Sequence, residues 1–487
     1  MTPASVYAAP KNRKNSDYTD IDAYVAMQMK GMKIPGMALG IVQGNRIVHL
    51  HGFGKADETG RPVTVKTPFR IGSITKSFTA LAVMQLVEAG KIDLDEPVQT
   101  YLPWFHVADE KASAKITVRQ LLTQTSGFST LSGNDFWDSK DGLEAAVKNL
   151  HKVELTQPVG ARFQYSNINY SIAGLIVEKA SRQSLAEYFS KRIFSPLAMR
   201  HSHIDPASAS ADGQAMGHLH SLGHMYPDAG VAPPAYLPAG FVSASVEDMS
   251  HYAVAQLNNG RYLNSSVLSK NGVAQLHHPA APFRQNRAGT KDNYYGMGWV
   301  IGSVDNLPVI WHNGDTGRFH ATLIMAPERS LAVILLANAS GFEYLFEVDE
   351  IAKGVLNLLD GQAPPEPPLS HAFYRITYWG ILLLPLLFML SIARGWRHWR
   401  RGDFSALAKL PHSRRRQMWR ILWMLVPNLS VAAFFLVGMP KLTGLPHSAI
   451  RILYPDLGYA LMAGIAFGIA WSAVYTAMVL QVRTRSA

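Results

Sequence analysis

The pattern of hydrophobic and polar residues divides the chain into a long mixed region and an apolar tail. In the mixed region, helical spacing is found over Asp20–Lys30 and from Ser73 to about Ala89, where Gly90 follows as a stop signal. Alternation over Met37–Val42 and Arg46–Phe53 predicts two strands joined by a tight turn. Further helices are expected at Val118–Thr123, Gly142–Leu150 and Ile172–Arg182, and further strands at Val309–Trp311, His320–Met325 and Ala332–Leu336.

This order of elements indicates a fold class. Strands near both ends of the mixed region, with helices between them, predict an α/β (α+β) domain in which both termini contribute to one antiparallel sheet and a helical subdomain is inserted. The expected boundaries are an N-terminal extension at 1–19, the domain at 20–360, a stiff Pro-rich linker at 361–371 and a membrane domain at 372–487.

The tail contains three uncharged apolar runs, Ile376–Ala393, Ile421–Met439 and Leu457–Val482. Each has about 18 residues or more, enough for a helix to cross the roughly 30 Å hydrocarbon core of a bilayer. Tyrosine and tryptophan flank the first two runs, as is typical of membrane borders. We therefore expect three transmembrane helices rather than three buried helices of a soluble domain.

Charge is distributed unevenly along the chain. Residues 366–487 contain 14 lysines and arginines against 3 acidic residues, a net +11 that equals the +11 of the whole chain. The rest of the protein is therefore neutral, which argues against nucleic acid as a partner. Nine lysines and arginines lie between Arg394 and Arg420, so the positive-inside tendency places this connection in the cytoplasm. The preceding domain is then expected on the periplasmic or extracellular side of a bacterial cytoplasmic membrane.

Two features concern processing and redox chemistry. The chain has no cysteine, which excludes disulfides, thiolate metal sites and a cysteine nucleophile. Export of such a domain requires a signal, and the first ten residues have no apolar core, although Val6-Tyr7-Ala8 resembles the end of a cleaved signal. The chain is therefore expected to be a processed form.

The first candidate for chemistry is RIGSITKSFT, residues 70–79. Ser73 and Lys76 share one helix face, so their side chains can meet. A serine hydroxyl becomes a nucleophile when a base takes its proton, and a lysine can act as this base if burial lowers its pKa from about 10.4. The apolar residues expected to bury it are Ile74, Phe78 and Leu81. About one Ser-x-x-Lys match is expected by chance in a chain this long, so the motif alone is weak.

Two later motifs strengthen the case. In Tyr165-Ser166-Asn167, the phenol can pass a proton between the serine and a leaving group, and the amide can hold a substrate amide; the alternative for this motif is a helix cap. In His312-Asn313-Gly314, a strand ends on a polar residue and a glycine, and can lie against an extended substrate.

The ordered set Ser-x-x-Lys, Tyr-x-Asn and His-x-Gly resembles that of the penicillin-binding-protein and class C β-lactamase-like serine hydrolases. The stretches LLTQTSGF, PAGFVSASVEDM, YGMGW and ATLIMAPERSLAVILLAN agree, and the resemblance covers roughly 20–338. It implies the β-lactamase/transpeptidase-like fold. The roles it implies are Ser73 as acylated nucleophile, Lys76 as base, Tyr165 as partner acid/base, Asn167 as substrate contact, His312 and Gly314 as flanking residues, and the backbone N–H groups of Ser73 and Asp315 as oxyanion hole.

The chain departs from this family pattern at two positions. Gln124 replaces a histidine found in many relatives, which affects a supporting position only. His312 stands where penicillin-recognising enzymes place a lysine that pairs with the β-lactam carboxylate. A histidine with a pKa near 6.5 is mostly neutral at pH 7, so this attraction is weakened unless Arg318 replaces it. The departure favours esterases and peptidases of the family over β-lactamases.

Three histidines close together in the sequence do not favour a metal site. The three histidines His218, His220 and His224 have no carboxylate nearby at ligand spacing, and their Gly- and Pro-containing stretch is expected to be a loop that lines the substrate cleft. No metal and no cofactor are expected.

The whole architecture resembles the membrane-bound prodrug-activating peptidases, the colibactin-maturation peptidases among them, which remove acyl-D-amino-acid caps from peptide precursors. It implies a hydrolase that acts through an acyl-enzyme on small peptides or lipopeptides at the membrane lipid, next to a D-residue. The alternatives are a carboxylesterase with weak or no β-lactamase activity, and a sensor that signals through its membrane helices. A sensor usually has a cytoplasmic effector domain, and here the cytoplasmic connection has only 27 residues. The oligomeric state is left open.

Overall fold

The structure is a computed structural model that describes residues 18–137, 139–283, 293–342, 347–364, 370–401 and 414–484. It divides into two compact units, Met1–Pro368 and Leu369–Ala487. Most of the expected N-terminal extension, residues 365–369 of the linker and part of the basic connection lie outside the described residues. Each unit is described by itself.

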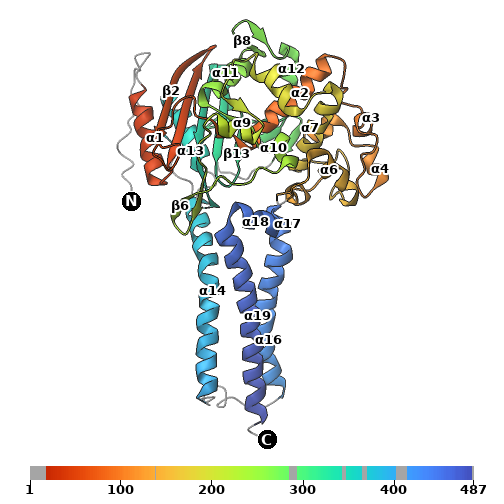
Figure 1. Ribbon diagram of the computed structural model, residues 1–487. Coiled ribbons are helices and arrows are strands. Elements are labelled where there is room, and N and C mark those ends of the chain that lie inside the picture. The colour runs from red at the N-terminus through yellow and green to blue at the C-terminus, as the bar shows by residue number, and fades with distance from the viewer. Residues whose placement is uncertain are drawn as a thin grey trace. The chain divides into compact units, whose positions relative to one another are not determined.

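The centre of the first unit is an eight-stranded antiparallel sheet with the strand order β10-β11-β12-β13-β14-β15-β1-β2 (Figure 1). Its strands are β1 (Gly36–Gln43), β2 (Arg46–Gly54), β10 (Ala281–Phe283), β11 (Asn293–Tyr295), β12 (Val300–Val304), β13 (Leu307–Asp315), β14 (His320–Ala326) and β15 (Leu331–Ala337). The first strand pairs with the last, with Met37 opposite Ala337. The predicted sheet, built from both ends of the domain, is confirmed.

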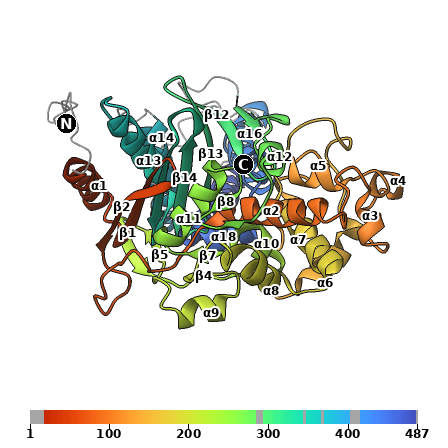
Figure 2. The same ribbon diagram turned by 90° about the horizontal axis from the view of Figure 1, so that it is seen from above.

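Helices cover both faces of this sheet (Figure 2). Helices α1 (Thr19–Gly31) and α13 (Glu347–Leu359) lie on one face, and α2 (Thr75–Glu88), α7 (Asn167–Ser181) and α11 (Val246–Leu257) belong to the other side. Because side chains alternate along a strand, Leu39 and Ile41 of β1 enter the core under α1 and α13, whereas Ala38 and Val42 enter the larger core that contains α2 and α7. The sheet is therefore packed between two hydrophobic cores, one on each face.

The remaining elements of the first unit are short. The α-helices are α3 (Val98–Tyr101), α4 (Glu110–Ser113), α5 (Val118–Leu122), α6 (Leu143–Lys148), α8 (Leu185–Phe189), α9 (Pro206–Ala211), α10 (Leu237–Gly240) and α12 (Lys270–Leu276). The 3₁₀-helices are η1 (Gly72–Ile74), η2 (Ser132–Asn134), η3 (Asn149–Lys152), η5 (Pro234–Tyr236) and η6 (Pro327–Arg329), and η4 (Ser190–Phe194) is a π-helix. The small strands are β3 (Phe69–Arg70), β4 (Ser202–His203), β5 (His218–Ser221), β6 (His224–Pro227), β7 (Ser243–Ala244), β8 (Arg261–Tyr262), β9 (Ser265–Ser266) and β16 (Ala339–Ser340).

The segment around His218 differs from the prediction. A loop was expected here, and this is wrong: β5 and β6 form an antiparallel hairpin, and β5 also pairs in parallel with β16. The reason is tertiary, because the partner strand comes from more than 100 residues further along the chain. His218 and His220 are consequently buried, whereas His224 is exposed.

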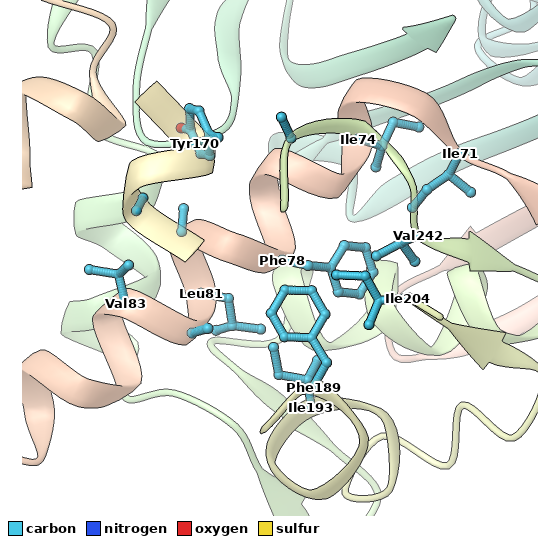
Figure 3. Packing of buried hydrophobic residues seen from close by; sticks show 14 of the residues in the cluster. Ile71, Ile74, Phe78, Leu81, Val83, Tyr170, Phe189, Ile193, Ile204 and Val242 are labelled. Carbon is cyan, nitrogen blue, oxygen red and sulfur yellow. The ribbon is translucent and has the colours of Figure 1, made fainter. Parts of the chain in front are cut away.

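The helix α2 passes through the larger core. Phe78 of α2 packs near Ile204 and Val242, and Ile74, the last residue of η1, lies in the same cluster, as Figure 3 shows. All four side chains are buried, and Phe189 and Ile193 extend the same cluster. The helix ends before Gly90, which has φ of +67°, a left-handed conformation that glycine adopts without strain. The predicted boundaries of this helix are confirmed within one or two residues.

The second unit consists of helices, namely α14 (Ser370–Arg400), α16 (Arg414–Ala433), η8 (Phe434–Gly438), α17 (Met439–Thr443), α18 (His447–Leu453) and α19 (Pro455–Thr484). Within the described residues, three segments are long and apolar enough to cross a membrane: Ala372–Arg400, Ile421–Lys441 and Pro455–Leu480. Both α14 and α16 pack against α19. Large apolar side chains such as Leu387, Trp423 and Ile469 remain exposed, as expected of helices that face lipid.

Candidate active site

Ser73 and Lys76 lie at the junction of η1 and α2. Ser73 is the middle residue of η1 and partly exposed, whereas Lys76, one turn later, has an exposed fraction of 0%. The distance between Lys76 Nζ and Ser73 Oγ is 3.0 Å. The sequence prediction that the two side chains meet on one helix face is confirmed.

Three further groups complete a hydrogen-bonded cluster. Lys76 Nζ donates to Asn167 Oδ1 at 2.8 Å and to the Ala239 carbonyl at 2.7 Å. The Tyr165 hydroxyl donates to Ser73 Oγ at 2.8 Å. A neutral amine has two hydrogens and one lone pair, so the two donated bonds leave the lone pair for the Ser73 hydroxyl. The same three contacts also satisfy the three N–H donors of an ammonium, so it is the burial of Nζ, and not its hydrogen bonds, that favours the neutral form.

Burial lowers the pKa of Lys76 well below its usual value. The residues expected to bury it, Ile74, Phe78 and Leu81, are not the ones that surround its amine. Successive residues of a helix are turned by about 100°, so these three project from nearly the opposite side of α2. Instead, Nζ lies 4.8 Å from the ring centroid of Tyr165 and 5.8 Å from that of Tyr170.

Gln124 holds the segment that carries Tyr165. Its side-chain Oε1 accepts from the backbone N–H of Ser166 at 2.9 Å and from Asn169 Nδ2 at 2.5 Å, and its carbonyl accepts from the N–H of Gln164 at 2.8 Å. Burial raises the pKa of Tyr165, so its phenol stays protonated at neutral pH. Asn167, the first residue of α7, also donates to Asn134 Oδ1 at 3.0 Å.

The end of β13 lies directly against η1. A Cβ added to Gly314 would approach the Ile71 carbonyl oxygen to 2.0 Å and the Ser73 nitrogen to 2.6 Å. A Cβ on Gly72, whose φ is +53°, would lie 2.6 Å from the Asp315 nitrogen. Two glycines therefore let the strand approach the serine turn, and they bring the backbone nitrogens of Ser73 and Asp315 into one small region.

His312, the third motif, is buried and neutral. Its Nδ1 donates to the Asn313 carbonyl at 2.6 Å, and its Nε2 lies 3.3 Å from the Tyr295 hydroxyl. Burial, and then the nearby amine of Lys76, lower the pKa of His312 to about 3. Arg318 is not an available positive charge, because its guanidinium contacts Asp228 Oδ2 at 2.6 and 2.9 Å. Neither His312 nor Arg318 therefore offers an unpaired positive charge beside β13.

A buried acid–histidine cluster lies behind β13. His320 is 3.2 Å from Asp315 through Nδ1 and 3.0 Å from Asp349 through Nε2. Asp349 also accepts from Thr322 Oγ1 at 2.6 Å and from Asn313 Nδ2 at 2.7 Å, while Asp315 accepts from Ser340. Burial by itself lowers the pKa of His320, but the two carboxylates outweigh it and raise the pKa to about 10. The imidazolium therefore joins β13, β14 and α13.

This cluster predicts how stability depends on pH. The folded pKa of His320 is above the unfolded value of about 6.5, so its stabilisation is complete below pH 6.5 and is lost as pH rises through about 10. The free energy of unfolding should fall over that window, with this residue contributing up to about 1.4 kcal/mol per pH unit. Urea denaturation at pH 6.5–10 of the wild type and the His320→Gln variant measures the difference. Parallel curves for the two proteins would contradict the assignment.

Some residues of the cluster were missed by sequence reasoning. Ala239 acts only through its backbone carbonyl, so its side chain does not indicate its role, and Asn134 lies on η2 outside every motif. Tyr295 and Ala239 do fall within YGMGW and PAGFVSASVEDM, two stretches that resembled the family. The histidine trio is not brought together as a metal site in the described part of the chain. His218 instead contacts Glu58 Oε1 at 2.9 Å and the Asn338 carbonyl at 3.0 Å.

Comparisons with known proteins show the family to which the chain is similar. The β-lactamase family model matches residues 21–355. The chain is 26% identical to Protein flp of Staphylococcus aureus over 395 residues, which cover 79% of this chain and 76% of that protein. It is 30% identical to penicillin-binding protein 4 of Amycolatopsis lactamdurans over 343 residues, covering 68% and 88% of the two chains.

A solved structure is also similar. The octameric penicillin-binding protein homologue from Pyrococcus abyssi matches with a TM-score of 0.62 and 28% identity, over 74% of this chain and 81% of that one. The matched family region contains the sheet, α2, α7 and every residue of the Ser73 cluster. The chain therefore belongs to the β-lactamase family, whose members are generally serine hydrolases related to the penicillin-binding proteins.

Proposed function

We propose that this protein is a membrane-anchored, extracytoplasmic serine hydrolase that forms an acyl-enzyme on Ser73 and cleaves amide bonds next to a D-amino acid in peptides or lipopeptides. The observation that carries the proposal is the cluster of Ser73, Lys76 and Tyr165, with distances of 3.0 and 2.8 Å to the serine oxygen. A partly exposed hydroxyl beside a buried amine of lowered pKa is the arrangement of an activated nucleophile.

In the proposed acylation, Ser73 Oγ attacks the substrate carbonyl carbon while its proton passes to Lys76 Nζ. The negative charge on the carbonyl oxygen is stabilised by the backbone N–H groups of Ser73 and Asp315, which lie close together beside Gly72 and Gly314. Tyr165 gives its proton to the leaving nitrogen and receives one from Lys76, and the C–N bond breaks. Water then cleaves the Ser73 ester in the reverse order of proton transfers.

Two observations support the substrate class. With His312 neutral and Arg318 paired to Asp228, the β13 edge has no unpaired cation at these two positions to attract the carboxylate of a β-lactam. This favours substrates that continue as an amide beyond the scissile bond. The three apolar helices of the second unit favour a substrate that partitions into or near lipid, since a freely soluble ester requires no membrane anchor.

The Tyr165→Phe variant tests the proposed proton relay. It removes one hydroxyl and keeps the ring that covers Lys76, so we expect the protein to fold and kcat/KM to fall by about 10²–10⁴-fold. The matched control is Tyr226→Phe, which removes a hydroxyl from an exposed tyrosine on β6. Equal activity of the two variants would show that the Tyr165 phenol does not transfer the proton.

The substrate proposal is tested by comparing the turnover of three compounds by the full chain in detergent. These are an N-acyl-D-asparaginyl peptide, a short p-nitrophenyl ester and a chromogenic cephalosporin. We expect the D-peptide to be cleaved with the highest kcat/KM, its L-epimer at least about tenfold more slowly, and the cephalosporin slowly or not at all. Rapid ester cleavage without D-peptide cleavage would instead identify a carboxylesterase. Stable acylation of Ser73 without turnover of any substrate would identify a sensor.

A further inference from the structure

The first helix and the edge strand of the sheet bring three side chains together, those of Asp22, His49 and His51. Their strand, β2, is at the end of the sheet. Asp22 is in the first turn of α1, and His49 and His51 alternate on β2, which is the outermost strand beside β1. Because residues two apart on a strand point to the same face, both imidazoles lie on the side of the sheet that α1 covers. Ile21 and Val25 of α1 pack into the core on this side.

Each oxygen of one carboxylate meets a different imidazole. His49 Nε2 lies 2.8 Å from Asp22 Oδ1, and His51 Nδ1 lies 2.7 Å from Asp22 Oδ2. The donor atoms of all three residues lie within 4.8 Å of one another. Among the residues that the structure describes, no other group of three histidine or acidic side chains meets this condition.

Aromatic neighbours set the orientation of both imidazoles. Tyr18 stacks on His49 with ring centroids 4.7 Å apart, and Phe53 stacks on His51 with centroids 4.3 Å apart. The side chains of Asp22 and His49 are 20% and 17% exposed, and that of His51 is 44% exposed. The donor atoms are therefore held in place by packing while one side stays open to solvent, which leaves an entry path and room for a water ligand.

We propose that Asp22, His49 and His51 bind one divalent transition-metal ion of the zinc class, with water as the remaining ligand. Two imidazoles and one carboxylate are a donor set that suits Zn²⁺, whereas Mg²⁺ and Ca²⁺ require mainly oxygen ligands. Neighbouring ligand atoms around a tetrahedral zinc are about 3.3 Å apart, so contacts of 2.7 and 2.8 Å need to widen by only about half an ångström.

Binding requires a change of tautomer and no other chemistry. The ring nitrogens that face Asp22 carry the hydrogens of the two hydrogen bonds, and the ion takes their place. His49 then binds through Nε2 with its proton on Nδ1, and His51 binds through Nδ1 with its proton on Nε2. The ion joins the start of α1 to the exposed edge of the sheet, so its effect is to stabilise this helix on β2 rather than to take part in the reaction at Ser73.

The test uses the full chain, purified in detergent without a polyhistidine tag, stripped with EDTA and titrated with Zn²⁺ alone by calorimetry. We expect one saturable site per chain in the wild type, and at least about tenfold weaker binding in Asp22→Asn and His51→Ala. Asp22→Asn keeps the shape of the side chain, and His51 is the most exposed of the three, so these variants should fold. The matched control is His203→Ala, because His203 also contacts one aspartate, Asp212, at 2.8 Å.

Hydrogen exchange supplies a local readout that is independent of activity. Zn²⁺ should slow amide exchange in α1 and β2 of the wild type and of His203→Ala, and should leave exchange in His51→Ala unchanged. The proposal is overturned if the wild type binds no stoichiometric Zn²⁺. It is also overturned if His51→Ala binds Zn²⁺ as tightly as the wild type does. It is equally overturned if His203→Ala, and not His51→Ala, loses the site.

Discussion

Replacement of Ser73 by alanine should abolish covalent labelling by a serine-reactive fluorophosphonate and lower kcat/KM by about 10⁴-fold or more. The hydroxyl is the only group of the cluster that is both partly exposed and hydrogen-bonded to Lys76 and Tyr165. Without it no acyl-enzyme can form, and Lys76, Tyr165 and the backbone N–H groups can assist only a direct attack by water. Mass spectrometry of the labelled wild-type protein should place the adduct on Ser73.

The control for this prediction is Ser210→Ala, which removes a hydroxyl from an exposed position on α9. It should label and turn over substrate as the wild type does. An adduct on any other residue, or labelling that persists in Ser73→Ala, would rule out Ser73 as the nucleophile. It would also remove the basis for the acyl-enzyme in the proposed function, whatever the substrate proves to be.

The second large effect is expected for Lys76→Met. Methionine has nearly the length of lysine but cannot accept a proton, so we expect kcat/KM to fall by about 10³–10⁴-fold at the pH values where Lys76 is neutral in the wild type. Because the serine and the lysine act as one unit, the double variant Ser73→Ala/Lys76→Met should be no less active than Ser73→Ala alone. Measurement of kcat/KM for the three variants on one substrate decides this.

The pH profile of the wild type sharpens this prediction. Only the neutral amine can take the Ser73 proton, and burial lowers the pKa of Lys76 well below 10.5. Activity should therefore be present at neutral pH and decline on the acid side as Nζ becomes protonated. Lys66→Met, at an exposed lysine, should keep both the activity and the profile. If Lys76→Met retains more than about a tenth of the activity, another group must act as the base.

Much of the fold could be predicted because its signals are local. The strand alternation of residues 37–42 and 46–53 and the turn between them led to the hairpin of β1 and β2, and Gly90 marked the end of α2. The three apolar runs of the tail correspond to the three long helices of the second unit. The pairing of the first strand with β15 followed from the presence of strands at both ends of the domain.

Other parts could not be predicted, since they depend on contacts between distant segments. The hairpin of β5 and β6 was expected to be a loop because its residues carry turn signals, and its pairing with β16 overrides them. The residues near the Lys76 amine were misassigned because helical spacing reveals which residues share a face but not which face meets a partner. Asp22 lies 27 residues before His49, so no motif connects them either.

The sequence by itself determined the apolar helices and the Ser73–Lys76 pair, because a helical turn and a run of apolar residues are properties of neighbouring residues. The fold family followed from the resemblance of its ordered motifs to known proteins. Only the tertiary structure decided which groups surround that lysine, by burying its amine beside the Tyr165 ring, Asn167 and the carbonyl of Ala239. It likewise decided that His312 is neutral and His320 charged, although both are buried histidines. The physical reason is that a pKa depends on desolvation and on the charges within a few ångströms, and these come from segments that only the folded chain brings together.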